Sequence, residues 1–260
     1  MAYEFIRVDR EGPVTVFILN RPEVMNALHS PAHFELHEAF DAFAADPEQW
    51  VGIVTGAGER AFSAGNDLKH QAGGGGMASP PSGFAGLTSR FDLTKPLIAA
   101  VNGVAMGGGF EIALACDLIV AADTATFALP EPRVGLAALA GGLHRLPRMI
   151  GQKQALGMIL TGRRVSAAEG QALGFVNEVT KPDELMAAAR RWAAQICELS
   201  PMSIRASKEA VYKGLDEPTL EAAIKGQNRY PAVAALFKSE DFVEGPLAFA
   251  QKRAPNWKGR

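Results

Sequence analysis

The chain has 260 residues, of which 48% are hydrophobic and 21% are charged, as in an ordinary globular protein with one large core. Its 26 basic and 28 acidic residues give a net charge of −2, which argues against nucleic acid or an anionic membrane as a partner. The N-terminal segment has no secretory h-region, and the longest uncharged run, residues 96–110, is too short to span a bilayer. We therefore expect a cytoplasmic protein without a membrane span, in which Cys116 and Cys197 are free thiols.

The first half of the chain predicts strands and one long helix. Residues 3–9 and 13–20 alternate like two strands around a Glu11-Gly12 turn. A helical pattern follows over 30–45, with Ser30 as its expected N-cap and Pro31 at the first helical position. The runs VGIVTG (51–56) and PLIAAV (96–101) are typical of buried strands, and the Gly-, Ser- and Pro-rich segment 72–83 between them indicates a loop.

The second half changes from mixed to helical character. Residues 117–122 and 126–129 predict short strands, and helical patterns follow over 143–149, 152–160 and 182–199. From residue 200 onward nearly all signals are helical. We therefore predict an α/β body over residues 1–200 and a helical region over 201–260.

Three patterns resemble cofactor sites but lack the required context. GAGERA (56–61) matches G-x-G-x-x-A, yet no amphipathic helix follows at once and residues 74–80 contain no acid for a ribose. The glycines at 73–76 lack the Lys-Ser/Thr pair of a phosphate loop. His29, His33 and His37 share one helix face without a Cys or carboxylate ligand set, which favours a packed or solvated face over a metal site.

The segment AMGGGFEIALACDLIV (105–120) places a carboxylate in an apolar helix. Glycines at its start allow a close backbone approach, and the first amides of a helix have no intrahelical acceptor, so they suit a developing negative charge. Tight packing of the turn explains the glycines equally well. Glu111 lies in the first helical turn, either as an acid with a raised pKa or as a side chain that reaches solvent.

Two further segments expose backbone or charge after a strand. AFSAGNDL (61–68) is either a second anion-binding turn or an ordinary loop capped by Asn66 or Asp67. In ALPEPRVG (128–135), two prolines stiffen the backbone around Glu131, which is either a rigidly held functional acid or the partner of Arg133.

Taken together, these motifs resemble the crotonase superfamily, the enoyl-CoA hydratase/isomerase family, over nearly the whole chain. The matching residues are Arg21-Pro22, Asn26-Ala27-Leu28, 62–68, 95–103, the glycines before Glu111, Pro130-Glu131, Gly141-Gly142 and Arg145-Leu146. Residues 83–103 and 244–260 are most similar to the carnitinyl-CoA dehydratase branch. The resemblance implies an α/β spiral of ββα turns with a C-terminal helical trimerisation region.

The resemblance also implies a mechanism and its residues. A thioester oxygen would lie between the backbone amides of Asn66 and Gly108, while Glu111 and Glu131 act as acid and base on water and on the α-carbon. Hydratases of this family carry glutamate at both positions, twenty apart, as here. The expected activity is the hydration or dehydration of an α,β-unsaturated acyl-CoA, without metal or other cofactor, since coenzyme A is part of the substrate.

Two alternatives remain at this point. A Δ3-Δ2-enoyl-CoA isomerase would need only one of the two glutamates, and a non-catalytic acyl-CoA-binding protein would need neither. The chain also departs from typical hydratases at Ala138, where a proline is expected, so acyl preference is open. Phe84 and Phe91 are candidates to face a trimethylammonium group, or else are hydrophobic lid residues.

The remaining implied contacts concern coenzyme A and assembly. The resemblance assigns coenzyme A contacts to five residues, namely Ala64, Asp67, Leu68, Phe237 and Lys252. The last two would reach the nucleotide from the same or a neighbouring subunit of a homotrimer or homohexamer. Lys252 as a solvated helix charge is an equally ordinary interpretation.

Overall fold

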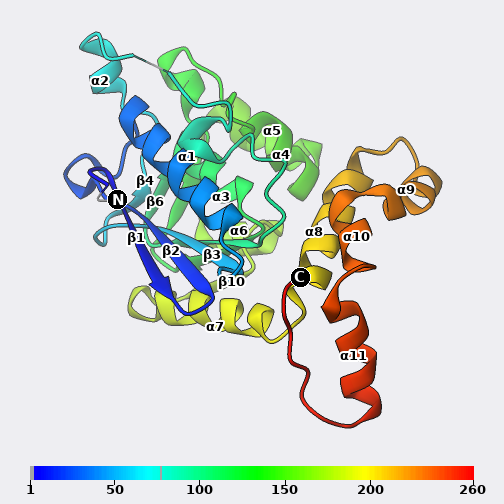
Figure 1. Ribbon diagram of the computed structural model, residues 1–260. Coiled ribbons are helices and arrows are strands. Elements are labelled where there is room, and N and C mark those ends of the chain that lie inside the picture. Colours follow the sequence, from blue (N-terminus) through cyan, green and yellow to red (C-terminus); the bar gives the residue numbers. More distant parts are fainter. Residues whose placement is uncertain (1–2, 77) are drawn as a thin grey trace.

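Two sheets form the body of the protein, as the computed structural model of residues 3–76 and 78–260 shows (Figure 1). The larger sheet has the order β1-β2-β3-β5-β7-β10, and all its neighbouring pairs except β1–β2 are parallel. Its strands are β1 (Ile6–Glu11), β2 (Val14–Leu19), β3 (Val51–Gly56), β5 (Leu97–Val101), β7 (Leu118–Ala122) and β10 (Glu178–Thr180). The strands β3 and β5 are buried throughout, as their continuous apolar sequences predict.

The smaller sheet has the order β4-β6-β8-β9, with bounds Ala61–Ser63, Val104–Met106, Thr126–Ala128 and Val165–Ser166. Three times in succession the chain gives one strand to the large sheet and the next to the small sheet: β3 then β4, β5 then β6, and β7 then β8. A helical segment follows each pair. This repeated passage is the predicted spiral of ββα turns, and it brings the ends of β4, β6 and β8 together at one edge.

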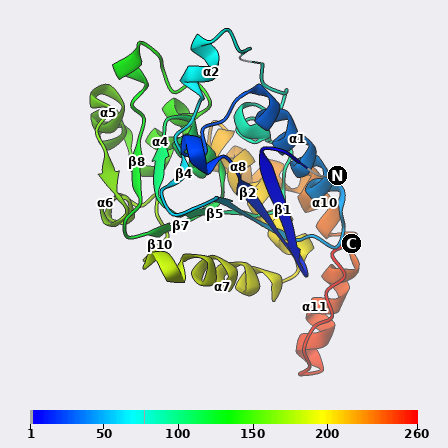
Figure 2. The same cartoon turned by 90° about the vertical axis from the view of Figure 1, so that its left-hand side faces the viewer.

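Helices cover both faces of the large sheet (Figure 2). In the body they are α1 (Ser30–Ala45), α2 (Leu68–Ala72), α3 (Gly108–Ala115), α4 (Gly142–Ile150), α5 (Gln152–Thr161), α6 (Ala167–Leu173) and α7 (Leu185–Cys197). Short 3-10 turns span Pro22–Val24 (η1), Phe84–Gly86 (η2), Glu131–Val134 (η3), Pro182–Glu184 (η4) and Gln227–Arg229 (η5).

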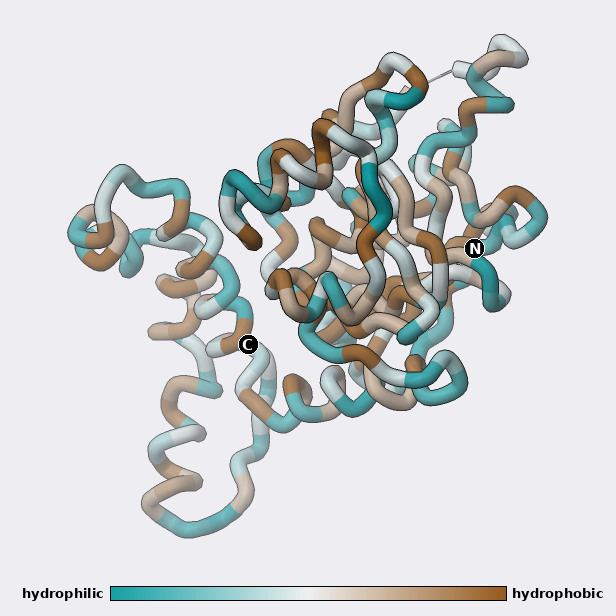
Figure 3. The backbone as a smooth tube through the Cα atoms, turned by 180° about the vertical axis from the view of Figure 1, so that it is seen from behind, coloured by the Kyte–Doolittle hydropathy of each residue, from teal (hydrophilic) through white to brown (hydrophobic). Residues whose placement is uncertain are grey.

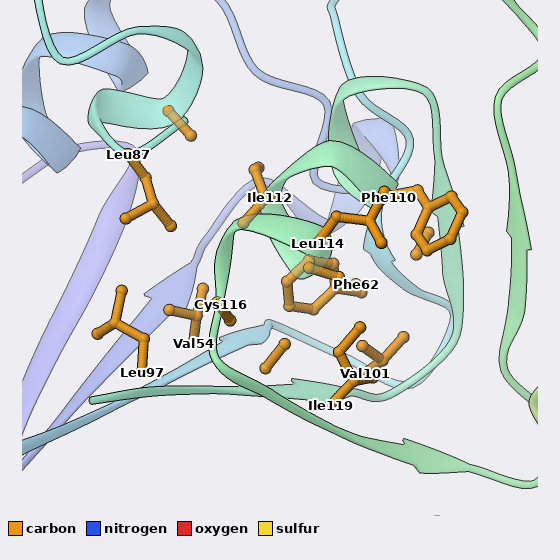
Figure 4. Close-up of a cluster of buried hydrophobic side chains, with 14 of the residues drawn as sticks. Val54, Phe62, Leu87, Leu97, Val101, Phe110, Ile112, Leu114, Cys116 and Ile119 are labelled. Carbon is orange, nitrogen blue, oxygen red and sulfur yellow. The ribbon is translucent and has the colours of Figure 1, made fainter. Parts of the chain in front are cut away.

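The main core lies on the face of the sheet that α1 and α3 cover. The predicted α1 stripe of Leu36, Phe40 and Phe43 is fully buried, and Phe40 and Phe43 both contact Phe17 of β2. Helix α3 is apolar on all sides, as expected of a helix enclosed by other elements. Its residues point into a cluster shown in Figure 4, whose labelled members are Val54, Phe62, Leu87, Leu97, Val101, Phe110, Ile112, Leu114, Cys116 and Ile119.

On the opposite face, α7 packs with the same large sheet in a second, smaller core. Its buried Leu185, Ala188 and Ala189 lie in one cluster with residues of the sheet such as Ile53 and Ile98. The short alanine side chains let this helix lie close to the strands. Sheet and helices thus form a layered body that holds the edge of the small sheet rigid.

The chain beyond residue 200 forms a helical appendage that projects from the body (Figure 1). It comprises α8 (Pro201–Asp216), α9 (Leu220–Gly226), α10 (Pro231–Leu236) and α11 (Glu240–Ala250). Lys208 and Tyr212 of α8 bond to the carboxylate of Asp117 at 2.8 and 3.0 Å, which ties the appendage to the body. The division at residue 200 itself stays a prediction.

The appendage exposes much apolar surface. Figure 3 shows hydrophobic segments recurring along it. Its exposed large apolar residues are Val211, Tyr212, Leu215, Leu220, Ile224, Phe237, Phe242, Val243, Leu247 and Phe249. Exposed large apolar side chains gathered in one region are typical of an interaction surface.

Some sequence-based predictions need correction. The N-cap of α1 is His29, and the Ser30 hydroxyl instead donates to the carbonyl oxygen of Ala78 at 2.5 Å. The strands β4, β6, β9 and β10 and helix α6 were not predicted. Residue 77 of the predicted loop and the first two residues of the chain lie outside the described residues.

Two smaller predictions concern membranes and cysteines. None of the helices in the described ranges combines the length and the apolar character needed to cross a membrane. Both cysteines are free thiols, as expected, with Cys116 buried and Cys197 partly buried.

Candidate active site

The glycine triplet forms the start of α3, with Gly107 as its N-cap and Gly108 and Gly109 as its first two residues. A Cβ placed on Gly109 would lie 2.1 Å from the carbonyl oxygen of Ser63, so this glycine allows close packing on β4. Gly107 has φ +54°, which turns the chain from β6 into the helix. Within residues 3–76 and 78–260, no acceptor receives the Gly108 amide. Packing and a free amide at the helix start therefore coexist.

Asn66 presents a second free amide through its bridge to Leu28. In this parallel bridge the Leu28 amide donates to Gly65 and the Leu28 carbonyl accepts from Asp67, both at 2.8 Å. The bonds thus go to the neighbours of Asn66, and its own amide points away from the bridge. Among the described residues it has no hydrogen-bond acceptor.

The two free amides lie on adjoining loops. A Cβ on Gly65, which has φ +87°, would lie 2.8 Å from the Gly108 nitrogen and 2.6 Å from the carbonyl oxygen of Met106. Only glycine permits both this conformation and this approach. The loops that carry the predicted pair, Asn66 and Gly108, are therefore in close contact.

Glu111 is enclosed and does not reach solvent. Its side chain projects from the first turn of α3, and the residue is 3% exposed. One carboxylate oxygen, Oε1, accepts from the Gly142 amide at 2.9 Å. Burial raises the pKa of Glu111 to about 7, and the charge of Glu131 adds to this rise, while the amides of Gly142 and Ala140 oppose it. Both protonation states are therefore accessible at neutral pH.

Glu131 lies directly after β8 in the short turn η3, between its two prolines. Its Oε1 approaches Gly107 so closely that a Cβ there would lie 2.8 Å from it, and its buried Oε2 has no partner among the described residues. Burial raises the pKa of Glu131 as well. Arg133 donates to the carbonyls of Thr161 and Gly162, which rules out the alternative of a Glu131–Arg133 pair.

Arg145 is a site residue whose position the sequence did not predict. Its guanidinium donates to the Thr88 carbonyl at 2.9 Å, and its charge acts on Glu111. It also lies beneath the Gly141-Gly142 turn that supplies the amide bond to Glu111. The sequence indicated Arg145 only through the Arg145-Leu146 motif, and no spacing rule predicts that this residue lies near Glu111.

The predicted coenzyme A contacts fall into two groups. Ala64, Asp67 and Leu68 adjoin the Asn66 amide, where Asp67 caps α2 and pairs with Arg21 at 3.0 Å. Phe237 and Lys252 lie on the appendage, which is well separated from α3 in Figure 1. The structure of one chain does not bring these two groups together.

One cavity lies away from this cluster, and a second borders it through Met106, Ala128 and Pro130. One of about 760 Å³ lies between α7 and the ends of β2 and β3, and one of about 410 Å³ is lined by residues that include Arg133 and Arg164. In the part of the chain that the structure describes, neither glutamate lines them. No group of three or more His, Cys, Asp or Glu side chains there is placed to hold a metal ion.

Comparisons with known proteins agree with this geometry. Residues 9–260 match the family described as enoyl-CoA hydratase/isomerase. The chain is 46% identical to carnitinyl-CoA dehydratase from Salmonella typhi, over 99% of both chains.

Solved structures are similar over the whole chain. Enoyl-CoA hydratase EchA1 from Mycobacterium marinum is 38% identical, with a TM-score of 0.92 over 98% of this chain and 99% of that one. Carnitinyl-CoA hydratase from Mycobacterium avium is 40% identical, with a TM-score of 0.78 over 98% and 99%. These similarities confirm the resemblance and the fold that the motifs predicted.

Proposed function

The chain belongs to the enoyl-CoA hydratase/isomerase family, and from this premise we propose that it adds water to, or removes it from, an acyl-CoA thioester across the α,β bond. The observation that carries the proposal is that two amides without an acceptor among the described residues occur together with the enclosed carboxylate of Glu111 and the partly buried carboxylate of Glu131. The similarity to proteins named as hydratases and dehydratases supports it.

The amides of Asn66 and Gly108 would stabilise the enolate. Attack of water at C3 moves charge onto the thioester oxygen, and donors that already point there need no rearrangement. Removal of one such donor in other enzymes costs about 3–4 kcal/mol. The dipole of α3 adds to the effect, because Gly108 is its first residue.

Glu111 and Glu131 would divide the proton transfers. One carboxylate takes a proton from water as the C–O bond forms, and the other gives a proton to C2 as the enolate collapses. Both groups have raised pKa values, which suits acid–base work near neutral pH. The Oε2 of Glu131 has no hydrogen-bond partner among the described residues, so this carboxylate keeps an oxygen for proton exchange with substrate.

A Δ3-Δ2 isomerase is less favoured by this geometry. Such an enzyme needs one carboxylate to move a proton between C2 and C4, whereas here burial raises the pKa of both acids and the charge of Glu131 acts on Glu111. A binding protein without catalysis would have no reason to keep either acid in an environment that raises its pKa.

The acyl group that the site prefers is proposed to be that of the carnitinyl branch. Of the two aromatic candidates for a trimethylammonium contact, Phe91 is 83% exposed and already has the Arg145 guanidinium 5.8 Å from its ring centre. Phe84 instead packs next to Gly108. This leaves Phe84 as the better-placed ring.

A homotrimer or homohexamer completes the proposal. The apolar residues on α8–α11 need a partner surface, and a neighbouring copy would also bring Phe237 and Lys252 towards coenzyme A. Light scattering during size-exclusion chromatography measures the assembly directly, and a monomer would contradict it.

The test of activity uses three substrates with the purified chain. Crotonyl-CoA and its 4-trimethylammonium derivative should both lose the absorbance of the conjugated enoyl thioester, with the better substrate identifying the acyl preference. But-3-enoyl-CoA should gain that absorbance only if the enzyme is an isomerase. Turnover of but-3-enoyl-CoA without hydration of either enoyl thioester would overturn the proposal.

A further inference from the structure

A single aromatic ring lies against the proposed oxyanion hole. Phe84 belongs to η2, in the connection between α2 and β5. A Cβ placed on Gly108 would lie 2.5 Å from Cζ of Phe84 and 2.6 Å from its Cε1, so the tip of the ring faces the Gly108 backbone. The ring therefore lies within reach of any group attached to a carbonyl bound at the Gly108 amide.

The backbone next to this ring adopts a conformation that alanine disfavours. Ala85 has φ +56° and ψ +22°, in the left-handed region, and is 1% exposed. A non-glycine residue is disfavoured in this region and persists there only where its surroundings enforce it. Such strain commonly marks a place where the chain directs a side chain for function.

His33 provides the bond that enforces this conformation. Its Nδ1 accepts the Ala85 amide at 3.1 Å in a buried contact, and its ring packs on Phe84 with centroids 4.4 Å apart. Burial lowers the pKa of His33 to about 4, so the ring is neutral at neutral pH and Nδ1 is free to accept. His33 thus contacts both the strained amide and the aromatic ring.

The rest of the turn is anchored on the same helix. A Cβ on Gly86 would lie 2.4 Å from the backbone nitrogen of His37, so η2 sits directly on α1. The Ser82 hydroxyl bonds Nδ1 of His37 at 2.9 Å. Helix α1 therefore fixes the turn on both sides of Phe84, and the ring cannot retreat without breaking these contacts.

From these contacts we propose that Phe84 is a specificity-determining residue that limits the size of the acyl group beside the oxyanion hole, and that His33 is the positioning residue that holds it there. The inference rests on the proposed function. It names a substrate class, namely thioesters with a short or compact acyl group. It also gives a role to a histidine that the sequence indicated only as part of a packed or solvated face.

The first experiment compares chain lengths. The ratio of kcat/KM for dec-2-enoyl-CoA to that for crotonyl-CoA is measured for the wild type, Phe84→Ala and the matched control Phe91→Ala, whose ring is exposed. Phe84→Ala should raise the ratio by roughly tenfold to a hundredfold, the usual discrimination of a pocket wall, and Phe91→Ala should leave it unchanged. Equal changes in kcat/KM for both thioesters would indicate that Phe84 contacts the coenzyme A part of the substrate rather than the acyl group, and would overturn the proposal.

The second experiment isolates the role of His33. His33→Ala should shift the same ratio in the direction of Phe84→Ala, because the Ala85 amide loses its acceptor. The double variant His33→Ala/Ala85→Gly should recover selectivity, since glycine adopts φ +56° without strain. A purely structural histidine would lower activity on all thioesters equally, and Ala85→Gly would not restore the ratio.

A third comparison tests the contact with Gly108. Gly108→Ala should lose activity because its Cβ collides with Phe84, and Gly108→Ala/Phe84→Ala should regain part of it. Absence of recovery would contradict the contact.

Calorimetry separates failure of the inference from failure of the proposed function. If the wild type hydrates no thioester, the proposed function fails. The relative affinities for decanoyl-CoA and butyryl-CoA then still test whether Phe84 limits the size of the acyl group. Phe84→Ala should then favour decanoyl-CoA, and an unchanged affinity ratio would overturn the inference.

Discussion

The segments that carry Glu111 and Glu131 are built in opposite ways. Helix α3 is enclosed by the two sheets, and its carboxylate is held by the Gly142 amide. The turn η3 lies at the surface with its following residues exposed, and two prolines, rather than packing, limit its movement. The core thus positions Glu111, whereas local backbone stiffness positions Glu131. The Oε2 of Glu131 has no hydrogen-bond partner among the described residues.

This difference shows how two identical side chains can take different roles. A carboxylate with a fixed hydrogen bond is suited to orient a water molecule, whereas one with an unpartnered oxygen is suited to exchange a proton with carbon. The variants below test whether the two segments contribute separately.

Neutralising either acid should have the largest effect. We expect Glu111→Gln and Glu131→Gln each to lower kcat for hydration of crotonyl-CoA by about 10²–10⁴-fold, the usual contribution of an acid or base. Glu221→Gln, at an exposed pair on α9, is the matched control and should retain full activity. If one of the two site variants retained wild-type activity, its segment would have no part in the chemistry.

The second-largest effect on activity is expected from a change in the loop that brings the Asn66 and Gly108 amides together. Gly65→Ala forces a Cβ against Gly108 and should lower kcat by about 10²–10³-fold, as loss of an oxyanion donor does. Gly74→Ala is a control for backbone strain, because Gly74 has nearly the same φ, +85°, but open space around it. Similar losses in both variants would point to strain alone.

The pH dependence of thermal stability should reveal the raised pKa of the buried Glu111. Because the folded pKa of Glu111 is raised from 4.5 to about 7, the wild type loses stability as the pH rises through this window. Glu111→Gln keeps the acceptor for Gly142 without the charge, so its Tm should exceed that of the wild type, by more at pH 8 than at pH 5. Each kcal/mol corresponds to about 2–4 °C in a chain of this size. A constant Tm difference between these pH values would contradict the raised pKa.

The smallest effect is expected far from both segments. Lys252→Ala should raise KM for crotonyl-CoA by about two- to fivefold, the value of an exposed ion pair with phosphate. Crotonyl-pantetheine, which lacks the nucleotide, should show no change. An equal rise for both substrates would place Lys252 outside the nucleotide site.

The sequence predicted the long elements of the fold because they bury continuous or periodic apolar residues. The range 30–45 of α1 and the strands β3 and β5 were found within one residue. The strands β4 and β6 have three residues each and β9 has two, too few for any periodicity. The Ser30 N-cap was wrong because its hydroxyl bonds a distant loop that local rules do not see.

For the site, motif spacing indicated Asn66, Gly108, Glu111 and Glu131, and the fold places them around one edge. It named Arg145 only as a motif residue and did not indicate its position near Glu111, nor the pairing of His33 with Phe84. Those contacts join segments that are more than thirty residues apart, through a strained turn. Such contacts depend on three-dimensional packing that no local pattern records.

The most direct test of the two-acid account follows the oxygen atom of water. Crotonyl-CoA incubated with the wild type in heavy-oxygen water should give a 3-hydroxyacyl thioester that carries one heavy oxygen at C3, seen by mass spectrometry. Both glutamine variants, Glu111→Gln and Glu131→Gln, should incorporate almost none in the same time. Exchange of carbon-bound protons without any oxygen incorporation by the wild type would contradict the account, because one acid would then suffice and no water would be added.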